Sequence, residues 1–129
     1  MGDQWQRQYV NAWLKSARYA VSGLTYVLRN ERNARIHLVF AIVVLLAGLA
    51  FRLSALELTA VLFAVIIVFL AEIFNSAFEK TLNIVSPGHH PTVKLVKDMT
   101  AGAVLFAATG AVVVGVVVFL PHILSLVFG

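Results

Sequence analysis

The sequence predicts an all-α membrane protein, with one N-terminal amphipathic helix on the membrane surface and three helices that cross the bilayer. Composition is the first reason. The chain of 129 residues is 60% hydrophobic with a mean hydropathy of +0.90, which is far too apolar for a soluble domain of this size. The second reason is that three stretches approach or exceed the roughly 20 residues needed to cross a bilayer. The length fits a single domain, residues 1–129, and the absence of cysteine excludes disulfides and thiolate chemistry.

Residues 1–32 are expected to form a basic amphipathic helix at the headgroup boundary. Apolar and aromatic residues, including Trp5, Tyr9 and Trp13, recur at helical spacing, and basic residues lie between them. A lid that packs on the other helices of the protein explains the same pattern, and the two interpretations are compatible. We do not expect a signal peptide here, since no apolar run begins before Arg35.

The three expected membrane spans cover residues 33–53, 56–84 and 92–120. The third is expected to end before Pro121, because proline disrupts a helix that continues through it. Lysine and arginine are concentrated before the first span and between the second and third spans, while the tail after Pro121 has none. The positive-inside rule therefore predicts a cytoplasmic N-terminus and a C-terminus outside.

The second expected span ends in a polar stripe within the segment AEIFNSAFEKTLN. Glu72, Asn75, Glu79 and Asn83 are separated by three, four and four residues, so a helix places them on one face. A carboxylate at the end of a long apolar run is costly in a membrane and indicates a functional site. We therefore expect Glu72 to act as a general base towards a hydroxyl group. The alternative is a structural acid that snorkels or faces the bundle interior.

Glu79 lies two turns beyond Glu72, with Asn75 between them. Carboxylate and amide oxygens suit a hard cation such as Mg²⁺ that is also held by phosphate oxygens. The alternative is a solvated acid at the end of the helix, paired with Lys80 or Lys97.

Charged residues also open the third expected span, at Lys94, Lys97 and Asp98. The lysines suit nucleotide phosphates, although interfacial lysines are also ordinary snorkelling anchors. Asp98 directly precedes an apolar run, which is less ordinary, and we expect it to have a functional role.

Other residues give weaker signals when taken alone. Glu31, just before the first span, is by itself typical of a solvated charge, and the adjacent His89 and His90 on a loop are poor metal ligands without further donors. The sequence has no GxxxxGK[ST] phosphate loop, so any nucleotide site must come from helix faces. Three spans enclose little interior, which favours an oligomer.

Two segments resemble the prokaryotic diacylglycerol kinase family of small membrane-integral lipid kinases. They are EIFNSAFE at residues 72–79 and KDMTAGAVL at residues 97–105. The resemblance extends over residues 16–121. The segments ERNARIH at 31–37 and VSP at 85–87 are more similar to the undecaprenol kinase branch found in Gram-positive bacteria.

This resemblance implies a homotrimer in the bacterial cell membrane, with active sites formed between neighbouring subunits and open to the cytoplasmic interface. It implies that Glu72 is the general base for the lipid hydroxyl and that Glu31 and Glu79 carry the Mg²⁺ that accompanies ATP. The residues that it places on the nucleotide side or as ordering groups are Asn75, His90, Lys97 and Asp98.

Asn83 departs from the family pattern, which usually has Asp at this position. The amide keeps the hydrogen-bonding shape but loses the charge, and the resemblance places Asn83 with the residues on the nucleotide side. The expected function is transfer of the ATP γ-phosphate to a membrane lipid, with undecaprenol as first choice and diacylglycerol as second. The alternatives from other classes are a non-enzymatic membrane trimer and a proton- or ion-conducting protein, and no nucleic-acid partner is expected.

Overall fold

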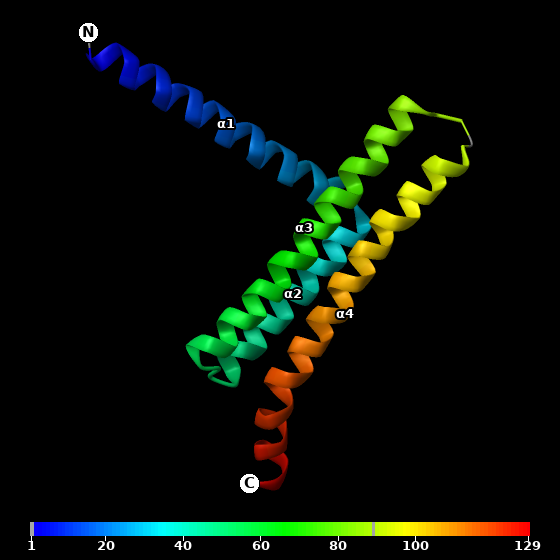
Figure 1. Ribbon diagram of the computed structural model, residues 1–129. Coiled ribbons are helices and arrows are strands. Elements are labelled where there is room, and N and C mark those ends of the chain that lie inside the picture. The colour runs from blue at the N-terminus through cyan, green and yellow to red at the C-terminus, as the bar shows by residue number, and fades with distance from the viewer. Residues whose placement is uncertain (1, 89) are drawn as a thin grey trace.

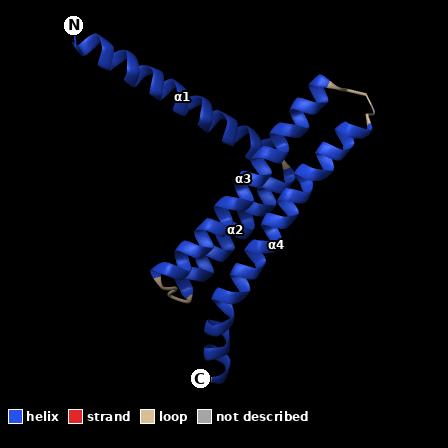
Figure 2. Ribbon diagram, viewed as in Figure 1, coloured by secondary structure: helices blue, strands red, loops and turns tan. Residues whose placement is uncertain are grey.

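The chain forms a bundle of three long helices from which a fourth helix projects (Figure 1). The structure is a computed structural model that describes residues 2–88 and 90–129, with side chains from residue 8 onward, so His89 and the side chain of Trp5 lie outside the described residues. The helices are α1 (Gly2–Asn30), α2 (Arg32–Ala50), α3 (Ala55–Val85) and α4 (Pro91–Phe128). Figure 2 shows only helices and short loops in the described part of the chain. The predicted all-α class is confirmed, and α2, α3 and α4 are each long and apolar enough to cross a membrane.

The N-terminal helix α1 leaves the bundle and runs across its long axis (Figure 1), and it packs on α2 and α3 near its own C-terminal end. Tyr9 and Trp13, near its free end, are 72% and 70% exposed. The helix is shorter than the expected 1–32, because Glu31 adopts an extended conformation (φ −98°, ψ 121°) and separates α1 from α2. The location of α1 on a membrane surface stays a prediction.

The turn between α2 and α3 is closed by a capping box at the start of α3. The Ser54 side chain accepts from the Glu57 N–H at 3.4 Å, and Glu57 Oε2 accepts from the Ser54 N–H at 2.8 Å. These bonds satisfy backbone donors that the first helical turn leaves unpaired. Glu57 Oε1 also lies 3.0 Å from His122 Nε2, so the same carboxylate ties the start of α3 to α4.

The expected end of the last span before Pro121 is wrong, because α4 continues through Pro121 to Phe128. Proline removes one backbone donor, whereas ending the helix would leave several carbonyl groups unpaired in apolar surroundings. Continuing the helix is therefore the less costly choice. The last turns of α4, red in Figure 1, turn away from the direction of the rest of the helix.

Helix α3 lies between α2 and α4 and packs on both of them, whereas in the described residues no Cα atom of α2 comes within 8 Å of one in α4. Small residues at seven-residue intervals, Ala34, Ala41 and Gly48, are buried on α2 and allow close helix approach. On α3 the buried residues are Val61, Val68, Glu72 and Ser76, which form one stripe. The buried face of α3 therefore changes from apolar to polar along a single line.

The capping box gives a test of the fold. Replacing Ser54 with Ala leaves the Glu57 N–H without its side-chain acceptor, and we expect a loss of about 1 kcal/mol in the free energy of unfolding. The measurement is the thermal unfolding midpoint in detergent. Thr59→Ala is the matched control, because the Thr59 hydroxyl only donates to the Ala55 carbonyl and its loss leaves no backbone donor unpaired. An equal loss in both variants would contradict this role for the cap.

Candidate active site

Glu72 is the most deeply buried charged side chain that the structure describes. It is 2% exposed, and its Oε2 atom has no hydrogen-bond partner among the described residues. Val68 and Ser76, one turn before and after it on α3, are also buried. Buried polar atoms are nearly always paired, so an unpaired carboxylate oxygen indicates a function for this group. It could accept a proton or bind a ligand.

The polar stripe predicted from the sequence exists as one face of α3. It runs from the interior of the bundle to the C-terminal end of α3, which we call the open end of the bundle. Glu72 is buried, Asn75 is half-buried, and Glu79 and Asn83 are exposed. The rise of a helix places Glu79 roughly 10 Å from Glu72 along the axis. The stripe can therefore offer one carboxylate to an apolar phase and another to water.

Glu31 lies at the break between α1 and α2, and its carboxylate is turned towards α3. Its Oε1 is 2.8 Å from Lys80 Nζ, and the same ammonium lies over the ring of Tyr26, 5.3 Å from the ring centroid. The two pairings considered for Glu79 are wrong, because Lys80 binds Glu31 and Lys97 binds Asn83.

The three predicted carboxylates converge on the same region without touching one another. Glu72 and Glu79 are both on α3, and Glu31 reaches the same helix through its contact with Lys80. No group of three His, Asp or Glu side chains in the described residues is close enough to hold a metal ion. Mg²⁺ commonly binds through one or two carboxylates together with water and substrate phosphates, and this donor set fits that mode.

Asn83 and Lys97 link the end of α3 to the start of α4. Lys97 Nζ donates to Asn83 Oδ1 at 2.6 Å, and Asp98 is exposed on the next position of α4. The pair fixes two of the predicted nucleotide-side residues next to each other. Since the acceptor is a neutral amide, the charge of Lys97 is not cancelled by it.

His90 has a structural role in addition to the predicted one. It is the N-cap of α4, its Nδ1 accepts from the Thr92 N–H at 3.2 Å, and Pro91 occupies the first helical turn. This assignment places a proton on Nε2, which is left to meet a ligand. Its contact with a nucleotide stays a prediction.

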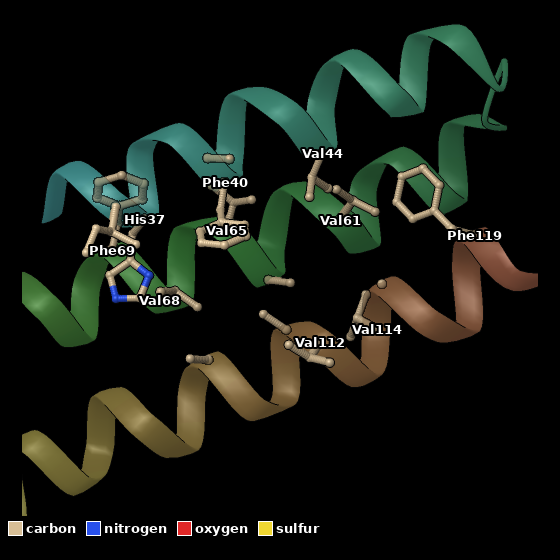
Figure 3. A pocket seen from close by; sticks show the side chains of 16 residues that line it. His37, Phe40, Val44, Val61, Val65, Val68, Phe69, Val112, Val114 and Phe119 are labelled. Carbon is tan, nitrogen blue, oxygen red and sulfur yellow. The ribbon is translucent and has the colours of Figure 1, made fainter. Parts of the chain in front are cut away.

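An apolar groove of about 320 Å³ runs between α2 and α4 along α3 (Figure 3). His37 lies at one end of the groove and Phe119 at the other, and Phe40, Val65 and Val112 lie between them. On α3 the lining reaches Val68 and Phe69, so Glu72 follows one turn beyond its end. The groove thus leads along the bundle towards the buried carboxylate.

Comparison with known proteins identifies the family. The model of a family described as prokaryotic diacylglycerol kinase matches residues 18–119. The chain belongs to this family. It is 37% identical over 123 residues to a diacylglycerol kinase of Synechocystis sp., covering 90% of this chain and 70% of the relative. It is 33% identical over 117 residues to an undecaprenol kinase of Bacillus subtilis, covering 91% of this chain and 95% of the relative.

The family resemblance stated from the motifs is therefore confirmed, and the chain is a member of a prokaryotic lipid kinase family. The two relatives are named for different lipids. The roles of individual residues in this lipid kinase are proposals that depend on the geometry described above.

The sequence reasoning missed two residues of this lipid kinase. Lys80 was considered only as a partner for Glu79, and the signal that could have placed it is its spacing of eight residues from Glu72, which returns it to the same face of α3. His37, at the end of the groove nearest Glu72, was noted only as part of a motif.

Proposed function

We propose that this chain is an ATP- and Mg²⁺-dependent kinase that phosphorylates the hydroxyl group of a membrane lipid, with Glu72 as the general base. The observation that supports this most directly is the position of Glu72. Its unpaired, buried carboxylate oxygen lies where the apolar groove ends and the polar stripe begins. A group in that place can meet a hydroxyl from the hydrocarbon side and a phosphate from the water side.

The proposed step is an in-line phosphoryl transfer. Glu72 takes the proton of the lipid hydroxyl as its oxygen bonds to the γ-phosphorus, and the bond from that phosphorus to the bridging β–γ oxygen breaks, releasing ADP. Such reactions need positioning and charge stabilisation more than covalent chemistry by the protein. The burial of Glu72 excludes water, which would otherwise compete with the lipid for the phosphoryl group.

The residues that would hold Mg²⁺ are Glu31 and Glu79, with Asn75 as a hydrogen-bonding group beside them. When bound, the metal ion would neutralise negative charge on the phosphate groups. Lys97 would bind phosphate oxygens, oriented by Asn83. The exposed Asp98 and the free Nε2 of His90 would contact the rest of the nucleotide.

We propose undecaprenol as the lipid, with diacylglycerol as the alternative. The undecaprenol kinase relative is matched over 95% of its length, compared with 70% for the diacylglycerol kinase relative. The groove between α2 and α4 is lined by apolar side chains, and its place beside Glu72 suits a hydrocarbon chain whose hydroxyl end reaches the carboxylate.

The proposed assembly is a homotrimer in the bacterial cell membrane with a cytoplasmic N-terminus and an external C-terminus. The excess of basic residues in α1 and around the α3–α4 connection supports this orientation. The direction of α1, across the bundle axis, suits a helix that lies in the plane of the membrane surface with Tyr9 and Trp13 as anchors (Figure 1).

Replacing Glu72 with Gln tests the proposed function. We expect the rate of lipid phosphorylation to fall by a factor of about 10²–10⁴, because the amide cannot accept the hydroxyl proton. The measurement uses purified protein in mixed micelles with labelled ATP, Mg²⁺ and either undecaprenol or diacylglycerol. The lipid that the unmodified protein phosphorylates faster decides between the two substrates.

Glu57→Gln is the matched control, since it makes the same chemical change at the opposite end of α3 and should keep activity. Retention of full activity by Glu72→Gln would exclude the proposed base. An unmodified protein that phosphorylates neither lipid but conducts protons across liposomes would instead support an ion-conducting function for Glu72.

Filling the groove tests where the lipid chain lies. Ala111→Phe adds a ring to the lining, and we expect the KM for a long-chain lipid to rise about tenfold, which corresponds to the loss of roughly two buried methylene groups. Turnover of a short-chain analogue should change little. Ala103→Phe, on an exposed position of α4 outside the groove, is the control. Equal losses for both lipids, together with loss of the oligomer, would assign the groove to a contact between subunits.

Asn83→Asp tests the charge at the nucleotide end. The new carboxylate would pair with Lys97 and cancel its charge, so we expect the KM for ATP to rise by up to about fivefold while kcat changes little. The measurement is a steady-state ATP titration at saturating lipid, with Asn11→Asp on α1 as a control for the added negative charge. A lower KM would show that an acid at this position helps to bind the metal–nucleotide complex instead.

A further inference from the structure

Lys80, on α3, contacts both helix α1 and the break between α1 and α2. It is on α3, its ammonium is 2.8 Å from the carboxylate of Glu31 at the α1–α2 break, and it lies over the ring of Tyr26 in α1. In the described part of the chain, these two contacts are the polar side-chain links between the α1 region and α3. No described residue of α1 is buried, so packing alone does little to fix the direction of this helix.

Glu31 is in a position from which its side chain would be expected to cap α2. It is the N-cap residue with an extended backbone, yet its side chain makes no cap hydrogen bond. Its carboxylate is used by Lys80 instead. The Glu31 side chain therefore does not stabilise the N-terminus of α2, and it binds a lysine of α3.

We propose that Lys80 is a positioning residue that fixes α1 across the bundle and holds the Glu31 carboxylate at the polar stripe of α3. It follows Ser76 by four residues and Glu72 by eight, which places it on the same side of α3 as the buried carboxylate. The pair is partly exposed, with side-chain exposures of 43% for Lys80 and 22% for Glu31. A partly exposed ion pair adds little to stability, so we expect this pair to set the direction of α1 and not to drive the folding of that helix. The consequence for catalysis rests on the proposed kinase function.

The test measures the direction of α1 and the activity separately. Because the chain has no cysteine, Ser16→Cys on α1 and Leu56→Cys at the far end of α3 give a single pair of labelling sites, both exposed. Spin labels at these sites, with labelled chains diluted in unlabelled ones, report the distance within one chain. We expect one narrow distance distribution for the parent, a broad one for Lys80→Met and a narrow one for Lys80→Arg, which keeps both the ion pair and the stacking on Tyr26.

The activity readout follows the same order. We expect Lys80→Met to lower kcat/KM for ATP about tenfold through misplacement of Glu31, and Lys80→Arg to stay within about threefold of the parent. The charge reversal Lys80→Glu with Glu31→Lys should restore the narrow distance distribution without restoring activity, because the carboxylate is then on the wrong helix.

An unchanged distance distribution in Lys80→Met would overturn the proposal, whether or not activity falls. In that case a fall in activity would mean that Lys80 acts on a reactant directly. Because the distances are measured without ATP or lipid, they decide the role of Lys80 even where Glu72→Gln shows that the proposed kinase mechanism is wrong.

Discussion

The structure is organised around the burial of one carboxylate, Glu72, in a bundle whose other buried side chains are almost all apolar. Polar groups in hydrocarbon must be satisfied from within the protein, so a buried carboxylate with an unpaired oxygen is costly. Two features of the bundle lie next to this carboxylate. The polar stripe leads outward through Asn75 to Glu79, and the groove leads from Phe119 to His37.

The two ends of the bundle differ in how their side chains are paired. At the end away from α1, Glu57 binds both the Ser54 cap and His122, and the rings of Phe51 and Phe119 pack edge to face with centroids 6.0 Å apart. Those contacts close the bundle between α3 and the C-terminal part of α4. At the other end, the end of α3 and the start of α4 project past the α1–α2 break (Figure 1), and Glu79 and Asn83 are exposed there.

Local patterns in the sequence predicted the three apolar helices and the polar face of α3, because hydrophobicity and a 3.6-residue period are properties of neighbouring residues. The features that the sequence did not predict depend on residues far apart in the chain or on the surroundings of the helix. Glu31 ends the first helix and pairs with Lys80, which is 49 residues away, so no local pattern links the two residues. Pro121 was expected to end a helix from its own chemistry, but the apolar surroundings favour continuation. The resemblance supplied roles for residues such as His90, but not the cap that this residue forms.

Lys80 and Lys97 have different partners, and this difference divides the charges at the open end into a region on α3 and a region at the start of α4. Lys80 is neutralised by Glu31, whereas Lys97 binds a neutral amide and keeps its charge. Among the described residues, the carboxylates of Glu72 and Glu79 are in no ion pair. A cation is therefore favoured along α3 and an anion at the start of α4. In the proposed reaction, phosphate groups bound between these regions would have a metal ion on the side of the stripe and Lys97 on the other side, and this arrangement would direct the terminal phosphate towards the lipid hydroxyl at Glu72.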